Sequence, residues 1–153
     1  MVFFYSEPLV DTVFDEKQQK MKYVSTGSES LATENEYKQL LDILRSTSKE
    51  FLIRKEAINF ESLKKMVAQK PKIIHISCHG DFDDEKKQFY LQFEGMGNGV
   101  ADKFYESRLM DLLGSEKDHG IKLAFVSACH SEEIGNVLRK CNIPLVIAVN
   151  SES

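Results

Sequence analysis

The chain has 153 residues, of which 42% are apolar and 29% charged, a balance that excludes a disordered polypeptide and suffices for one domain with a buried core. The net charge of −4 at pH 7 is made of both signs spread along the chain, so no basic stripe indicates nucleic acid as a partner. The longest apolar runs, such as residues 143–149, are less than half of a bilayer span, and we expect no membrane segment.

Three cysteines are an odd number, and their spacing is not that of a metal knuckle. Nothing at the N-terminus has the composition of a secretion signal. We therefore expect reduced thiols in a cytoplasmic protein.

The first elements predicted are a strand and a helix. The strand covers Val2–Tyr5 and is closed by Pro8, and a Ser-, Thr- and Gly-rich loop is expected over residues 25–30. Thr33 and Glu36 form a capping-box pattern that predicts the start of a helix. Apolar residues then recur at helical spacing: Tyr37, Leu40, Leu41 and Leu44.

A second strand and helix follow, and then a third strand. Residues 51–53 are apolar and predict the strand, whereas Asn59 can cap a helix. The apolar face of that helix consists of Phe60, Leu63, Met66 and Val67. Pro71 separates it from a strand predicted over residues 72–78.

The middle of the chain is less regular. Residues 89–93 alternate like an edge strand or one arm of a hairpin, and residues 95–99 form a glycine-rich turn or loop. A short helix is expected to begin near Ser107, and a strand over residues 121–128. Ser131 is expected to cap the next helix, after which residues 145–149 form a fifth strand.

Alternating strands and helices with continuously apolar strands predict an α/β fold. Its sheet should be mostly parallel and covered by helices on both faces, as a three-layer α-β-α sandwich. We find no internal repeat and no second domain, so residues 1–153 are expected to form a single domain. Right-handed crossovers then place the carboxyl ends of all strands at one edge.

Two of the apolar runs end in a chemically reactive side chain. The run KIIHISCHGD leads to His79 and Gly80, and IKLAFVSACHS leads to Cys129. Both side chains should meet at the carboxyl edge of the sheet, where α/β folds bind ligands. Imidazole is a suitable base for a thiol near neutral pH, and the Gly80 and Cys129 amides are candidates for an oxyanion hole.

The other histidines and cysteines are predicted to be structural. His75 is expected to be a hydrogen-bonded core residue, Cys78 and Cys141 to be packed in the core, and His119 to be exposed in a turn. A zinc site built from Cys78, His79, Cys129 and His130 is disfavoured, because neighbouring strand residues point to opposite faces. We expect no metal and no organic cofactor.

The segments HISCHGDFD, FYLQFE, IKLAFVSACHSE and IPLVIAVN resemble those of a CHAT domain, a caspase-like peptidase related to separase and the metacaspases. The resemblance extends over nearly the whole chain, since VFFYSEPL, TENEYKQLLDIL and FESLKKMV also match. It implies a cysteine endopeptidase with His79 as general base, Cys129 as nucleophile, an oxyanion pocket from the Gly80 and Cys129 amides, and a polypeptide substrate.

The sequence also departs from this family. Metacaspases carry an Asp two residues before the nucleophile that helps bind a basic P1 side chain, but this chain has Ser127 there. Arginine or lysine preference is therefore not carried over from that position. Glu132 stands where Gly is usual after Cys-x-Ser. The family's domain continues beyond the last matching strand, which implies a C-terminally incomplete domain and further domains of a longer protein.

The leading hypothesis is peptide-bond hydrolysis by a His79–Cys129 dyad through an acyl-thioenzyme. Asp81 and Ser127 are weaker candidates for substrate binding. The acidic cluster of Asp81, Asp83, Asp84 and Glu85 has a second interpretation as a solvated loop. Two rival hypotheses remain: a caspase-like scaffold without catalysis, and a flavodoxin-like or receiver-type domain.

Overall fold

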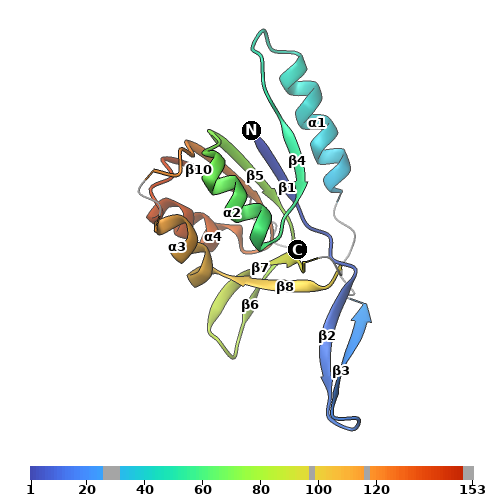
Figure 1. Ribbon diagram of the computed structural model, residues 1–153. Helices are drawn as coiled ribbons and strands as arrows, with labels where there is room; N and C mark the ends of the chain where they lie inside the picture. The colour runs from blue at the N-terminus through green and yellow to red at the C-terminus, as the bar shows by residue number, and fades with distance from the viewer. Residues whose placement is uncertain (26–31, 97–98, 116–117, 150–153) are drawn as a thin grey trace.

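A five-stranded parallel sheet forms the centre of the protein (Figure 1). The computed structural model describes residues 1–25, 32–96, 99–115 and 118–149. The strands of this sheet are β1 (Val2–Tyr5), β4 (Arg54–Ala57), β5 (Ile73–Ser77), β9 (Leu123–Ser127) and β10 (Leu145–Val149). They lie in the order β10-β9-β5-β1-β4, with every neighbouring pair parallel.

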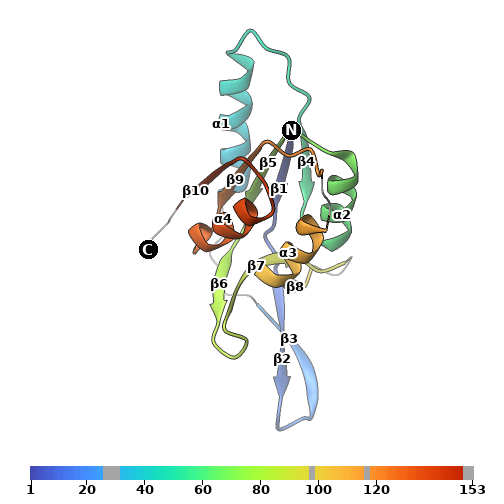
Figure 2. The same ribbon diagram turned by 90° about the vertical axis from the view of Figure 1, so that its left-hand side faces the viewer.

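Helices cover both faces of the sheet, which confirms the predicted three-layer α/β architecture. They are α1 (Thr33–Arg45), α2 (Phe60–Gln69), α3 (Glu106–Gly114) and α4 (Ser131–Lys140). Figures 1 and 2 show α1 on one face and α2, α3 and α4 on the other. The larger hydrophobic core lies under the three helices, where Phe4, Ile76 and Val126 are fully buried.

Two small antiparallel sheets are added at the carboxyl edge of the central one. The first is the hairpin of β2 (Val10–Asp15) and β3 (Lys20–Ser25). The second contains β6 (Gly80–Asp83), β7 (Gln88–Glu94) and β8 (Ala101–Tyr105). The strand expected over residues 89–93 is therefore confirmed as β7, whereas β2, β3, β6 and β8 had no predicted counterpart. Residues 26–30 and 97–98 of the expected loops lie outside the described residues.

The start of α2 agrees with the sequence. The Asn59 side chain accepts a hydrogen bond from the Ser62 amide, and the Ser62 hydroxyl accepts one from the Asn59 amide. This capping box satisfies two amide groups that the helix itself leaves without partners.

The strand predicted over residues 51–53 is wrong, because β4 begins at Arg54. Pairing with β1 starts at Val2 opposite Arg54, and the edge position of β4 lets it carry charged residues that an interior strand would not.

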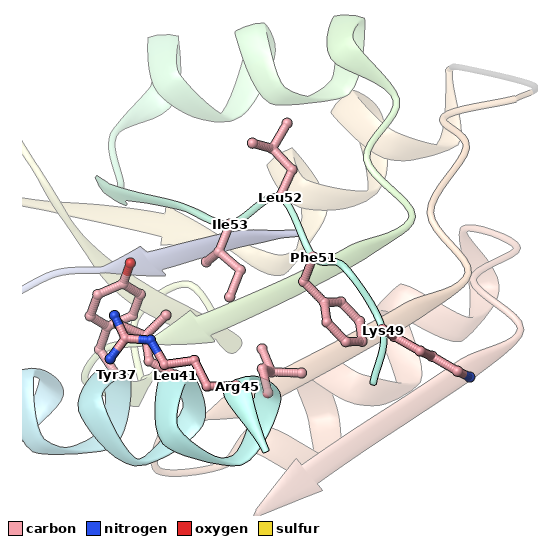
Figure 3. Close-up of a pocket in the computed structure, with 8 residues that line it drawn as sticks. Tyr37, Leu41, Arg45, Lys49, Phe51, Leu52 and Ile53 are labelled. Atoms are coloured by element: carbon pink, nitrogen blue, oxygen red, sulfur yellow. The ribbon is translucent and has the colours of Figure 1, made fainter. Parts of the chain in front are cut away.

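The apolar run of residues 51–53 instead lines a cavity of about 410 Å³ beside the end of α1. Figure 3 shows Phe51 and Ile53 pointing toward α1 and Leu52 pointing away. This cavity lies at the amino end of β4, at the sheet edge opposite His79 and Cys129.

Both helix caps predicted from hydroxyl side chains are wrong. Ala32 is the N-cap of α1, and the Thr33 hydroxyl donates to Glu7 at 2.7 Å. His130, in the left-handed region at φ 55°, is the N-cap of α4, and Ser131 is its first helical residue. For Thr33 a tertiary partner replaces the predicted cap, whereas for Ser131 the left-handed turn at His130 moves the start of the helix by one residue.

His119 is buried, which contradicts the expectation of an exposed turn residue. Its Nδ1 accepts a hydrogen bond from the Ile121 amide, so the proton lies on Nε2, which donates to the Cys141 carbonyl at 2.8 Å. The core positions predicted for His75, Cys78 and Cys141 are confirmed. No helix in the part of the chain that the structure describes is long and apolar enough to cross a membrane.

Candidate functional site

The pairing of β5 with β9 brings the two candidate reactive residues to the same place. Ser77 lies opposite Ser127 in the parallel register, and the Cys78 amide then donates to the Ser127 carbonyl at 3.1 Å. The two chains therefore leave the sheet side by side. His79 follows on one and Cys129 on the other, both at the carboxyl edge.

Gly80 is in close contact with the segment that carries Cys129. A Cβ atom placed on Gly80 would come within 3.0 Å of the Cys129 carbonyl oxygen, a separation that real Cβ atoms essentially never show. Ala128 lies 3.5 Å from the same point. Only glycine therefore permits this approach of the two backbones without a shift.

The Gly80 amide points away from β7. The Gln92 amide donates to the His79 carbonyl at 2.8 Å, which makes those two residues a hydrogen-bonded pair of the ladder. Gly80 and Leu91, the next pair, are then of the non-hydrogen-bonded kind. The Gly80 N–H group is thus directed away from β7, toward the outer edge of the β6-β7-β8 sheet, an orientation compatible with its candidate role as an oxyanion donor.

Cys129 differs from the other two cysteines in exposure. Cys129 is half-buried, whereas Cys78 and Cys141 are 1% and 2% exposed. Burial raises the pKa of both buried thiols, and the nearby Cys129 adds to the effect at Cys78. Cys129 lies in a tight turn between β9 and α4, followed by His130 in the left-handed region. Such a conformation is strained for a non-glycine residue, and strained turns cluster at functional sites.

A polar network supports the two strands from the α1 side. The Glu36 carboxylate accepts a hydrogen bond from the Ser77 hydroxyl at 2.6 Å and lies 2.9 Å from His75 Nε2. It also forms a hydrogen bond with the Ser127 side chain. The His75 ring stacks between two phenylalanine rings, with centroid distances of 4.5 Å to Phe3 and to Phe125.

The charge on Glu36 is maintained despite its partial burial. Burial alone would raise the pKa of this carboxyl group, but the hydrogen bonds from His75, Ser77 and Ser127 hold the pKa below the ordinary value of 4.5. The capping-box pattern predicted a helix-capping role for Glu36, so its contacts with His75, Ser77 and Ser127 were not foreseen from the sequence. The available signal was the alternation that puts His75 and Ser77 on one face of β5.

The remaining candidate residues have structural partners. Ser127 is engaged by Glu36, and Asp81 is exposed on β6 with its carboxylate near the Tyr90 hydroxyl at 3.5 Å. Asp83 accepts hydrogen bonds from the Lys86 amide at 3.0 Å and the Tyr105 hydroxyl at 2.7 Å, which help lower its pKa to about 2. Among the described residues, no three His, Cys, Asp or Glu side chains converge as a metal site would require.

A parallel sheet flanked by helices, with His and Cys segments adjoining at its carboxyl edge, defines a caspase-like α/β protein. The family model of the CHAT domain matches residues 7–141, which is most of the chain. The chain belongs to the CHAT domain family, a caspase-like family. No curated protein matches the chain.

Replacing Glu36 by glutamine removes the charge but keeps the size of the side chain. We expect Glu36→Gln to lower the free energy of unfolding by about 1–3 kcal/mol at neutral pH, since three partners lose a charged acceptor. The folded-state pKa is lowered, so the wild-type advantage is present above pH 4.5 and disappears as the pH falls through the folded value. Denaturant unfolding of both proteins at a series of pH values measures this difference in the free energy of unfolding.

Glu34→Gln is the matched control for this experiment, because Glu34 is on the same helix but exposed, and pairs only with Lys55 among the ion pairs of the described residues. Glu34→Gln should change the free energy of unfolding only slightly at every pH. An equal loss of stability in the two variants would contradict the role of the network.

Replacing Gly80 by alanine forces the Cys129 carbonyl to move. We expect Gly80→Ala to lower the free energy of unfolding by about 1–3 kcal/mol and to change the alkylation rate of Cys129. Gly114→Ala is the control, since Gly114 has no atom within 4 Å of the added methyl group and lies at the end of α3. Denaturant unfolding and thiol labelling measure both variants, and similar behaviour of the two would refute the close contact.

Proposed function

We propose that this protein is a cysteine endopeptidase in which His79 and Cys129 form the catalytic dyad. The main observation in support is the register of β5 and β9, which makes the two segments adjoin where the only half-buried cysteine lies. Membership of a caspase-like family supports the same reaction class. The substrate is a polypeptide, and no metal or organic cofactor enters the reaction.

The proposed reaction has two steps. In the first, His79 takes the proton of the Cys129 thiol as the sulfur attacks the carbonyl carbon, and the amides of Gly80 and Cys129 stabilise the oxyanion. His79 gives this proton to the leaving amine as the C–N bond breaks, and a thioester remains. In the second step, water loses a proton to His79, attacks the thioester and releases the acid product, with the thiol restored.

The position of the thiol relative to α4 indicates that it needs the histidine. Cys129 lies just before the amino end of α4, where a helix dipole favours a negative charge. Glu132 and Glu133 in the first turn of α4 oppose that effect. We therefore infer that activation of the thiol depends on His79 more than on the helix.

Alkylation with iodoacetamide tests the dyad. We expect labelling of Cys129 alone in the folded protein, because Cys78 and Cys141 are buried. The rate should fall at least about tenfold in His79→Ala. His130→Asn is the control, since it removes a neighbouring exposed imidazole and asparagine tolerates the left-handed conformation. Equal labelling of the three cysteines, or no effect of His79→Ala, would count strongly against the dyad.

Hydrolysis of a quenched-fluorescent peptide library is the functional measurement. Cys129→Ala and His79→Ala should each lower kcat/KM by a factor of about 10² or more. Activity that survives in Cys129→Ala would exclude this cysteine as the nucleophile. An unreactive Cys129 together with no hydrolysis by the unmodified chain would favour a non-catalytic interaction module.

A further inference from the structure

The β2–β3 hairpin stands away from the rest of the protein. Figures 1 and 2 show it extending beyond the carboxyl edge of the central sheet, without a helix against it. At its base, the Leu9 and Val10 amides donate to the Gly99 carbonyl, and Val10 forms an isolated bridge with Val100. A two-stranded hairpin is marginally stable in water unless one face is covered, so its exposed faces need an explanation.

One face of the hairpin is apolar and the other is charged. Thr12 pairs with Tyr23 and Phe14 with Met21, which puts these four side chains on one face. Phe14, Met21 and Tyr23 are 52%, 57% and 71% exposed. These three large side chains therefore lie together on one face, and more than half of the surface of each is exposed to solvent. We call this surface, made of Thr12, Phe14, Met21 and Tyr23, the apolar hairpin face.

The opposite face provides a natural comparison. It contains Asp11, Val13, Asp15, Lys20, Lys22 and Val24. Lys22 and Asp15 form an ion pair there, while Val13 and Val24 are 51% and 40% exposed. Two valines among charged residues are ordinary surface positions.

The hairpin begins at the same sheet edge as the candidate dyad. The Ser6 amide, just past the end of β1, donates to the carbonyl of Ser77, two residues before His79. β2 begins at Val10, four residues after Ser6. The six residues of β2 are about 20 Å long. The hairpin is therefore long enough to lie along several residues of an extended peptide that leaves this edge of the sheet.

We infer that the apolar hairpin face binds an extended, apolar segment of the polypeptide substrate, several residues away from the scissile bond. This inference rests on the proposed peptidase function. A two-stranded surface does not enclose a small molecule, which needs a concave site. Tyr, Phe and Met are enriched in protein-binding surfaces, and Met adapts to varied partners.

The strand edge offers a second element of recognition. Among the residues that the structure describes, β3 pairs with β2 alone over residues 20–24, so the outer edge of this segment can accept a further extended chain. If a chain pairs with this edge of β3, every second one of its side chains lies on the same side of the enlarged sheet as Met21 and Tyr23, beside the apolar hairpin face. Backbone pairing is tolerant of sequence, and the aromatic and methionine side chains select for apolar residues at alternate positions.

Binding of an unfolded polypeptide tests this inference without hydrolysis. The probe is reduced, carboxymethylated α-lactalbumin, and the host is Cys129→Ala, so that no cleavage occurs. We expect the added pair Met21→Ser and Tyr23→Ser to weaken binding about tenfold or more. The control pair Val13→Ser and Val24→Ser, on the opposite face, should change binding less than about twofold.

Equal losses of affinity for the unfolded protein in the two double variants, or no binding of it by the Cys129→Ala host, would overturn the inference. Light scattering adds a further arm. A dimer that dissociates only when Met21 and Tyr23 are replaced would assign the apolar hairpin face to a second copy of the chain and would also overturn it. Circular dichroism confirms that both double variants are folded.

A kinetic arm separates this inference from the proposed function. With Cys129 intact, replacing Met21 and Tyr23 should lower the ratio of kcat/KM for the unfolded protein to that for a five-residue peptide by about tenfold. An unchanged ratio would contradict the inference while leaving the dyad in place. Absent hydrolysis of both substrates would contradict the proposed function, and the binding result would still decide the inference.

Discussion

The parallel pairing of β5 with β9 is the constraint on which the candidate site depends. It fixes Ser77 opposite Ser127 and extends one hydrogen bond past the strands, to the Cys78 amide. Two segments that are 50 residues apart in the chain thereby become neighbours (129 − 79 = 50). The absence of a side chain at Gly80 lets their backbones come closer than any other residue would allow.

The two faces of the sheet support this pairing by different means. On the side of α2 and α4, apolar residues such as Ile76 and Val126 are fully buried and contribute the hydrophobic part of the stability. On the side of α1, the Glu36 carboxylate joins Ser77 and Ser127, and His75 is held between aromatic rings. This polar network lies two residues before each member of the candidate dyad, and its directional hydrogen bonds fix the relative position of β5 and β9 more specifically than apolar contacts do.

Added β-structure surrounds the same edge of the sheet. β6 begins at Gly80 itself, and the β2–β3 hairpin begins a few residues beyond β1. The central sheet therefore supplies the reacting groups in our proposal, and the small sheets supply surfaces on which a polypeptide can lie. Such a division is common in α/β proteins, where loops and additions at the carboxyl edge carry recognition.

Most strands of the central sheet, and the positions of His79 and Cys129, could be predicted from the sequence, because buried parallel strands are continuous apolar runs. The position of β4 could not be predicted, because its register is set by pairing with β1 and its charged residues Arg54, Lys55 and Glu56 suit only an edge strand. The buried state of His119 depends on the Cys141 carbonyl, 22 residues away. The network of Glu36 likewise joins residues 39 and 41 positions apart, which local patterns do not reveal.

The hairpin was missed for a related reason. In β2 (VDTVFD) apolar and polar residues alternate only weakly, although they alternate over residues 20–23 of β3. The turn between the two strands lacks the Asn-Gly or Asp-Gly pair that marks two-residue hairpins. Local sequence rules detect elements that are stabilised by their own pattern. They do not detect those whose stability depends on contacts at the base or, in our proposal, on a bound chain.

The most direct test of the account is a crystal structure of the protein after reaction with a peptidyl acyloxymethyl ketone. The account predicts a thioether at Cys129, with the oxygen of the adduct about 2.7–3.1 Å from the amide nitrogens of Gly80 and Cys129 and the His79 ring beside the sulfur. An adduct on another side chain, or a Cys129 adduct whose oxygen faces away from both amides and whose sulfur lies far from His79, would contradict it.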